Sequence, residues 1–171
     1  MTNNHPKKIL QIRAFDLPLG NKFIIVIKKN ILGLEQGIKI SVNFPVSAKI
    51  LYDSWLNSKI HSAFTGSKVR IEPRQSSPFT MWNGYITGTN VVLQPYGRIV
   101  QNWRTTEFPD GSPDSKLEIL FEKHNSGTKL TIIHSHLPPG DEKKYEKGWK
   151  DNYIKPMKLY FKNSKTSDRS K

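Results

Sequence analysis

The stretch DEKKYEKGWKDNYIKPMKLYF at residues 141–161 decides the fold, because it has the pattern of one long amphipathic helix. Its large apolar side chains recur every three or four positions, the spacing that places them on one helical face. They are Tyr145, Trp149, Tyr153, Met157 and Tyr160. Asp141 is a suitable N-cap, so we expect a helix from about Glu142 to Phe161.

The opposite face of this helix is basic. It carries Lys143, Lys147, Lys150 and Lys158. We interpret these lysines as a solvated face, with docking of an acidic partner surface as the alternative. Pro156 lies inside the pattern and cannot donate a hydrogen bond to the carbonyl of Asn152, which predicts a bend at that point.

The residues before this helix predict an antiparallel sheet. Residues 38–43 alternate as a strand, and two short helices follow, at about 48–57 and 58–63, before Gly66. Period-two segments separated by Pro, Gly and Asn turns come next, at 67–72, 79–87, 89–94, 98–107, 116–123 and 128–137. Strands joined by such short turns are antiparallel. Along one of these strands Leu117, Ile119 and Phe121 share a side, with Glu118 and Glu122 opposite.

This order of elements predicts an α+β helix-grip fold. A curved antiparallel sheet wraps around the long C-terminal helix, with two short helices after the first strand. We divide the chain into an N-terminal extension at 1–37, the helix-grip domain at 38–162, and a charged disordered tail at 163–171. Within the extension, Ile9–Phe15 and Phe23–Ile27 have strand patterns; the segment adds strands to a sheet edge, packs elsewhere, or is partly disordered.

Composition narrows the possible functions. The chain has 171 residues, a formal net charge of +13 and no cysteine, which excludes disulfides, thiolate metal ligands and a cysteine nucleophile. No signal peptide is apparent, and the longest apolar run is too short to cross a bilayer, so we expect a cytoplasmic protein. Charge is densest in residues 141–171, with ten basic and five acidic residues. Lysine dominates over arginine, so nucleic-acid binding is the less favoured interpretation.

Several motifs occur together in a specific order. They are Phe44-Pro45-x-Ser47-Ala48-x-x-Leu51-Tyr52-Asp53-x-Trp55-Leu56, His61-x-x-Phe64-Thr65-Gly66, Phe79-x-x-Trp82-x-Gly84-Tyr85-Ile86-x-Gly88, Ile99-Val100-Gln101-x-Trp103-Arg104, and Gly148-Trp149-x-x-x-Tyr153. This series resembles the domain of the activator of heat-shock protein ninety ATPase, homologue type, of the START-like (SRPBCC) superfamily. The resemblance spans about residues 38–161.

The resemblance carries functional expectations. It implies a helix-grip fold, a heat-shock chaperone as a partner, or an apolar small molecule held between the sheet and the last helix. Relatives in the chaperone system carry a larger N-terminal domain that also engages the chaperone, and 37 residues are too few for it. Some superfamily members are cyclases or hydrolases, which keeps an enzyme acting in the same cavity as the alternative to a non-enzymatic binding domain.

Aromatic side chains with a few polar groups are the usual lining of a small-molecule site. The candidate cavity residues are Trp55, Phe79, Trp82, Tyr85, Trp103, Arg104, Phe121, His134, Tyr145, Trp149 and Tyr153, with Arg104 and His134 as polar anchors. For any one tryptophan taken alone, packing in the core is the favoured interpretation. Lys143, Lys147, Lys150 and Lys158 are the candidate partner-binding residues.

No catalytic or metal-binding set stands out in the sequence. His134 and His136 are two positions apart in an expected strand and would face the same side, yet no recognisable third ligand accompanies them. Glu107, Glu118 and Glu122 fit a solvated face. We therefore expect no metal, no cofactor and no catalytic residue.

Overall fold

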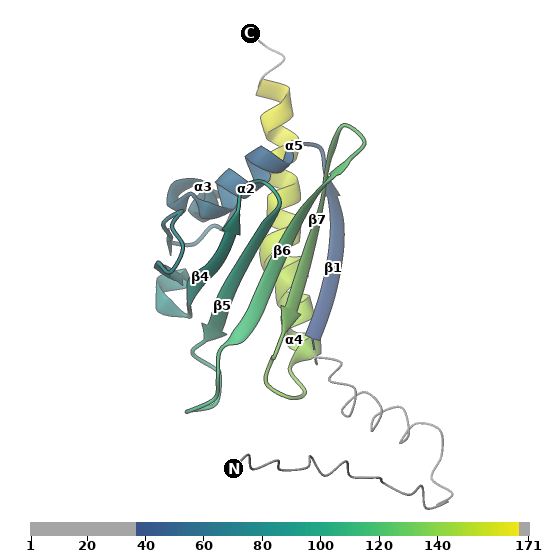
Figure 1. Ribbon diagram of the computed structural model, residues 1–171. Coiled ribbons are helices and arrows are strands. Elements are labelled where there is room, and N and C mark those ends of the chain that lie inside the picture. The colour runs from purple at the N-terminus through teal and green to yellow at the C-terminus, as the bar shows by residue number, and fades with distance from the viewer. Residues whose placement is uncertain (1–36, 168–171) are drawn as a thin grey trace, which may run out of the picture. The chain divides into compact units, whose positions relative to one another are not determined.

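The computed structural model describes residues 37–167 of the chain, with side chains for residues 37–162. The strands expected at Ile9–Phe15 and Phe23–Ile27 lie outside the described residues, as do residues 168–171. Figure 1 shows a twisted sheet with one long C-terminal helix across its face and two short helices beside it. The α+β helix-grip fold is therefore confirmed.

The sheet is antiparallel throughout, with seven strands in the order β1-β7-β6-β5-β4-β3-β2. The strands are β1 (Gly37–Phe44), β2 (Val69–Arg70), β3 (Pro78–Met81), β4 (Ile86–Gln94), β5 (Arg98–Thr105), β6 (Ser115–His124) and β7 (Gly127–Ser135). Leu117 and Ile119 are fully buried on the inner face as expected. On the outer face Glu118 pairs with Arg98 across β5 and β6, at 2.5 Å.

Two helices follow β1, as the sequence indicated. They are α2 (Ala48–Leu56) and α3 (Ser58–Thr65). The Ser47 hydroxyl caps α2 by accepting from the Ile50 amide at 3.3 Å. The Asn57 side chain caps α3, and Gly66 ends it in the left-handed conformation at φ 70°.

The strand expected at 79–87 is wrong, because the chain turns in its middle. β3 ends at Met81, and a 3₁₀ turn η1 (Trp82–Gly84) leads into β4. Gly88, which we expected to separate two strands, lies inside β4 opposite Phe79. A Cβ at this position would collide with the Phe79 ring and the carbonyl oxygen of Asn102. Gly88 therefore leaves space for the Phe79 ring within the sheet and does not form a turn.

The C-terminal helix has three consecutive parts: α4 (Glu142–Gly148), a π-helical segment η2 (Trp149–Ile154), and α5 (Lys155–Ser167). It therefore runs beyond the expected end at Phe161. The Lys155 amide donates to the Lys150 carbonyl, five residues back. Pro156 has no amide to continue the ladder, and the wide turn immediately before it accommodates the interruption.

The π-helical segment also keeps the apolar side chains on one face. Tyr145, Trp149, Tyr153, Met157 and Phe161 are all buried and are spaced by four. At 3.6 residues per turn, each step of four rotates the side chain by about 40° beyond a full turn. A wider turn in the middle offsets this drift, so all five side chains stay buried on one side of the helix.

Candidate functional site

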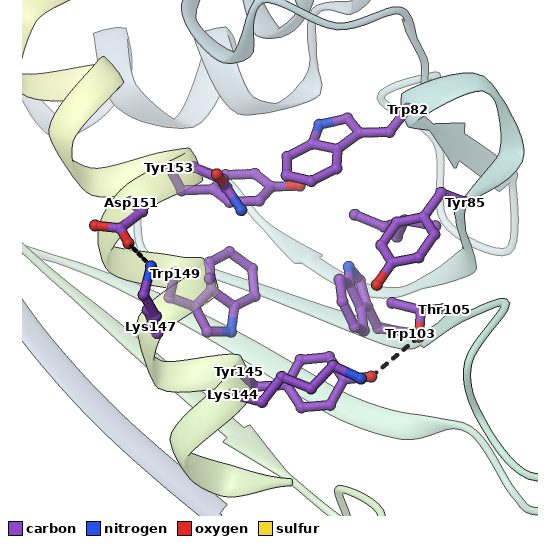
Figure 2. A pocket seen from close by; sticks show the side chains of 13 residues that line it. Trp82, Tyr85, Trp103, Thr105, Lys144, Tyr145, Lys147, Trp149, Asp151 and Tyr153 are labelled. Atoms are coloured by element: carbon purple, nitrogen blue, oxygen red, sulfur yellow. Dashed lines mark hydrogen bonds and ion pairs between the residues drawn. The ribbon is translucent and has the colours of Figure 1, made fainter.

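A pocket with a volume of about 490 Å³ lies between the π-helical segment and the sheet (Figure 2). It falls within the range of about 300–1,000 Å³ that is typical of small-molecule sites. Its lining is mainly aromatic: Trp82, Tyr85, Ile86, Trp103, Thr105, Lys144, Tyr145, Lys147, Gly148, Trp149, Asp151, Asn152 and Tyr153. We refer to it as the aromatic pocket.

The wall opposite the helix is formed by the turn after β3. Trp82 and Asn83 both adopt positive φ, at 54° and 55°. Such a conformation is costly for a bulky residue and persists only where surrounding contacts hold it. The Trp82 ring stacks on Tyr85, with an interplanar angle of 16°, and on Tyr153, with one of 14°. A strained backbone thus holds the indole against the pocket.

β5 forms the floor with Trp103 and Thr105, which alternate to the inner face. The Thr105 hydroxyl pairs with the Tyr145 hydroxyl at 3.0 Å and joins the floor to α4. The indole N–H of Trp103 is buried and has no hydrogen-bond partner among the described residues. The indole N–H of Trp82, which also lines the pocket, is likewise buried without a partner among the described residues. An unpaired buried donor costs about 1–3 kcal/mol.

The π-helical segment supplies Trp149 and Tyr153, which both point toward the sheet. Their ring centroids are 4.6 Å apart. The Tyr153 hydroxyl donates to the sulfur of Met81 at 3.4 Å, and burial raises the pKa of this phenol far above its ordinary value. Tyr153 therefore stays protonated at all physiological pH values and acts as an apolar wall.

Charged residues surround the mouth of the aromatic pocket. Lys144 forms an ion pair with Glu107, which lies just after β5. Asp151 accepts from two lysines, Lys147 at 2.5 Å and Lys155 at 2.6 Å. These two hydrogen bonds lower the pKa of Asp151 to about 2, so the carboxylate is ionised throughout the physiological range.

A chain of hydrogen bonds lies behind the aromatic pocket and links the helix to the sheet. The Trp149 indole N–H donates to His134 Nδ1 at 3.0 Å. Because Nδ1 accepts, the proton of the neutral ring is on Nε2, which donates to the Ser115 hydroxyl at 2.7 Å. Ser115 in turn donates to the Trp103 carbonyl at 2.5 Å.

This arrangement decides what the pair of His134 and Ser115 can do chemically. A catalytic histidine would have to accept the serine proton, but here it donates its own. Burial lowers the pKa of His134 to about 3, which keeps the imidazole neutral. The pair therefore holds the helix on the sheet and does not generate a nucleophile.

The structure brings six of the eleven candidate cavity residues to the aromatic pocket. They are Trp82, Tyr85, Trp103, Tyr145, Trp149 and Tyr153. Four others are buried in the core nearby: Trp55, Phe79, Phe121 and His134. Arg104 does not point inward as an anchor, because it follows Trp103 in β5 and faces the opposite side, where it contacts Asp114.

Pocket residues that the sequence reading missed are Ile86, Thr105, Lys144, Gly148, Asp151 and Asn152. Two signals were available for some of them. Thr105 is two positions from Trp103 in an alternating strand, and Lys144 and Gly148 are adjacent to inward aromatic residues on the helix. Asp151 and Asn152 lie in the π-helical segment, whose wider turn periodicity alone did not reveal.

The four lysines expected on the outer helix face, Lys143, Lys147, Lys150 and Lys158, are all exposed. Lys150 pairs with Glu146, and Lys147 also borders the aromatic pocket. The expectation that His134 and His136 share a face is wrong. β7 ends at Ser135, and His136 has φ 59° and is exposed, whereas His134 is fully buried.

The described part of the chain has neither a cluster of metal-ligating side chains nor a membrane-spanning helix. Within residues 37–167 no group of three or more His, Cys, Asp or Glu side chains is arranged to hold a metal ion. None of the described helices has the length and apolar character needed to span a membrane.

Some known proteins are similar to this chain in sequence, and others are similar to it in fold. The "Activator of 90 kDa heat shock protein ATPase homolog" of Dictyostelium discoideum is 30% identical over 128 residues, which are 74% of this chain and 33% of that protein. An uncharacterised Schizosaccharomyces pombe protein is 27% identical over 124 residues, 72% of this chain and 37% of its own length. The chain thus spans about a third of the length of these curated relatives.

A solved structure supports the fold, and a family model supports the family. The crystal structure of an HSP90 activator from Plasmodium falciparum superposes with a TM-score of 0.68 at 17% identity, over 72% of this chain and 94% of that one. The family model described as "Activator of Hsp90 ATPase homolog 1-like protein" matches residues 45–162, well over half of the chain. With the sequence motifs, the helix-grip fold and this match in agreement, the chain belongs to the family of activator of Hsp90 ATPase homolog 1-like proteins.

Proposed function

We propose that this domain is a non-enzymatic binding module that holds an apolar small molecule in the aromatic pocket. The observation that carries the proposal is the pocket of about 490 Å³ itself, which three of the four tryptophans line. Trp103 and Trp149 are each only 3% exposed, so at the base of the pocket they can serve the core and a ligand at once. Burial of an apolar ligand against them supplies the driving force for binding.

The ionisable groups at the site favour binding over catalysis. A general acid or base needs a pKa near the working pH. Asp151, the carboxylate in the lining, has its pKa lowered to about 2 by its two lysine partners. Burial raises the pKa of the Tyr145 phenol. Neither group is suited to exchange a proton with a ligand near neutral pH.

Gly148 offers a direct test, because it lines the pocket and a Cβ there has room. We expect Gly148→Leu to fill the pocket without removing any core contact. Binding of apolar probes such as 2-ethylnaphthalene and 1-decanol, measured by quenching of tryptophan fluorescence, is expected to fall by about tenfold or more. Lys143→Leu, on the exposed face of the same helix, is the matched control. Equal binding by the Gly148 variant and the wild-type protein would contradict the proposal, as would conversion of a probe to product.

A second candidate function is association with a heat-shock chaperone. It is favoured by the 30% identity to a protein named as an activator of the 90 kDa heat shock protein ATPase. The exposed face with Lys143, Lys150 and Lys158 suits an acidic partner surface, and such a role belongs in the cytoplasm.

The chaperone role is tested with a purified Hsp90-type chaperone. We expect the chain to raise its ATP turnover at low salt, and the triple change of Lys143, Lys150 and Lys158 to Glu to weaken the effect. The Gly148→Leu variant serves as the control, since it changes the pocket and leaves the lysine face intact. No change in turnover at tens of micromolar protein would exclude this role.

A further inference from the structure

Resting on the proposed small-molecule site, we propose that its ligand is a flat aromatic molecule that carries an anionic oxygen, as an aromatic carboxylate does. Three features of the aromatic pocket carry this inference: the parallel rings of its walls, an unpaired indole N–H, and lysines at the mouth. An aliphatic chain of the same volume would use none of them.

The pocket walls are shaped for a planar ligand. Trp82, Tyr85 and Tyr153 lie nearly parallel, with interplanar angles of 14° and 16° to Trp82, and Trp149 lies beside Tyr153. Figure 2 shows these rings around the space between the turn after β3 and the helix. A flat ring system can stack on the ring faces that border the pocket and gains the aromatic pair contact that a flexible chain lacks.

The Trp103 indole N–H calls for an oxygen acceptor. The side chain is 3% exposed, and its nitrogen has no hydrogen-bond partner among residues 37–162. In Figure 2 this nitrogen lies at the end of the ring that is directed toward Trp82 and Tyr153. Because this nitrogen is buried from solvent, a ligand oxygen that enters the aromatic pocket pairs with it by displacing the side chains that cover it. A carboxylate oxygen is a stronger acceptor than a neutral one.

The mouth supplies the positive charge. Lys147 lines the pocket and pairs with Asp151, which also accepts from Lys155. Lys147 can therefore turn to an incoming carboxylate while Asp151 keeps its second lysine partner. Lys144 is less available, because Glu107 has no second lysine among its described ion pairs. We assign Lys147 as the cation that meets the ligand.

The test compares four probes by isothermal titration calorimetry at low salt. They are 2-naphthoate (flat, anionic), 2-acetylnaphthalene (flat, neutral, with an oxygen), 2-ethylnaphthalene (flat, no oxygen) and decanoate (flexible, anionic). We expect 2-naphthoate to bind most tightly, 2-acetylnaphthalene second, and the other two about tenfold more weakly than 2-naphthoate. The preference for naphthoate over acetylnaphthalene should shrink as salt is added.

Two variants test separately the contact of the ligand with the Trp103 N–H and its contact with Lys147. Trp103→Phe keeps a ring and removes the N–H, so the advantage of 2-acetylnaphthalene over 2-ethylnaphthalene should disappear. Lys147→Gln should abolish the preference of the protein for the anion, with Lys158→Gln as the control. Tighter binding of decanoate than of 2-naphthoate would overturn this inference and leave the small-molecule site in place. Failure of all four probes to bind would overturn both.

Discussion

At the scale of single residues, His134 shows how the fold can fix a protonation state. It is fully buried, accepts from Trp149 and donates to Ser115, so both ring nitrogens are occupied when the ring is neutral. A second proton would lie on Nδ1 and oppose the Trp149 donor. His61 is also fully buried, and its Nδ1 pairs with the Trp55 carbonyl at 2.7 Å.

The two buried histidines predict acid sensitivity. Burial lowers the pKa of His134 to about 3 and that of His61 to about 4, from the ordinary histidine value of 6.5. In the unfolded chain both bind a proton at higher pH than in the native state. Stability is therefore full above pH 6.5 and falls as the pH drops from there toward 4, by up to about 1.4 kcal/mol per pH unit for each histidine.

Urea denaturation at pH 7.5 and pH 5 measures this effect. His134→Gln should roughly halve the loss of unfolding free energy between the two pH values, whatever its stability at pH 7.5. The exposed His124 provides the control, since His124→Gln should leave the loss unchanged. An identical loss in the His134 variant would mean that other groups govern the acid response.

Gly88 predicts a steric effect in the middle of a strand. Gly88→Ala would place a methyl group against the Phe79 ring and the Asn102 carbonyl. One of these is backbone, so the conflict cannot be relieved by a rotamer change alone. We expect a loss of about 2–3 kcal/mol in unfolding free energy. Phe79→Leu in the same background should recover part of it, whereas a neutral Gly88→Ala change would contradict this packing.

At the scale of elements, the π-helical segment behaves as a one-residue insertion in the final helix. Reverting it to α-helix with the same sequence would rotate α4 by about 100° against α5 and remove one set of aromatic contacts. Removing one exposed residue would instead close the wide turn and keep both faces packed. Lys150 is exposed and lies between Trp149 and Tyr153, which makes it the residue to delete.

Deletion of Lys150 is therefore expected to give a folded protein with altered binding. The helix content measured by far-UV circular dichroism should be retained, because Trp149 and Tyr153 would then be three apart on one α-helical face. Affinity for 2-naphthoate should fall by about tenfold, since Asp151 and the mouth shift relative to Trp82. Lys150→Ala is the control. Loss of folding on deletion would show that the wide turn is needed for stability itself.

The sequence was sufficient to predict most helices and strands. It was not sufficient to predict on which face every side chain lies or where every turn occurs. The aromatic helix, the two capped helices and the antiparallel order follow from periodicity and turn residues, and the structure has all of them. Arg104 was placed on the wrong face, because neighbouring residues of a strand point to opposite sides and Trp103 occupies the inner one. The turn at Trp82 was missed, since a tryptophan with positive φ is outside any turn preference.

One further signal was present and unused. Tyr145, Trp149, Tyr153 and Met157 follow one another at intervals of four residues, which is more than the 3.6 residues per turn of an α-helix. It points to a wide turn before Pro156, where the ladder is interrupted in any case. The extent of the aromatic pocket could not be derived in this way, because it depends on how the side chains of Trp82 and Tyr153 pack.

At the scale of the whole molecule, the net charge of +13 predicts the response to salt. Like charges repel in the compact state, and added salt screens them. Exposed ion pairs such as Lys49 with Asp53 contribute little to the free energy of unfolding, so screening them by salt costs little stability. We expect the melting temperature to rise by a few degrees between 20 and 300 mM sodium chloride at pH 7. Differential scanning calorimetry measures this change in melting temperature. A lower melting temperature at high salt would mean that the attraction within ion pairs outweighs the repulsion between like charges.

The hydrogen-bond chain from Trp149 through His134 and Ser115 has a consequence for the route by which a ligand arrives. It fastens the helix to the sheet on the inner side of the aromatic pocket, away from solvent. The contact between Lys144 and Glu107, in contrast, is about half exposed. Entry and exit of a ligand should therefore depend on the fast opening of the surface ion pairs at the mouth, Lys144 with Glu107 and Lys147 with Asp151, while the helix stays packed on the sheet. Exchange of ligand would then be rapid, and its rate would respond to salt much more than to any condition that loosens the core.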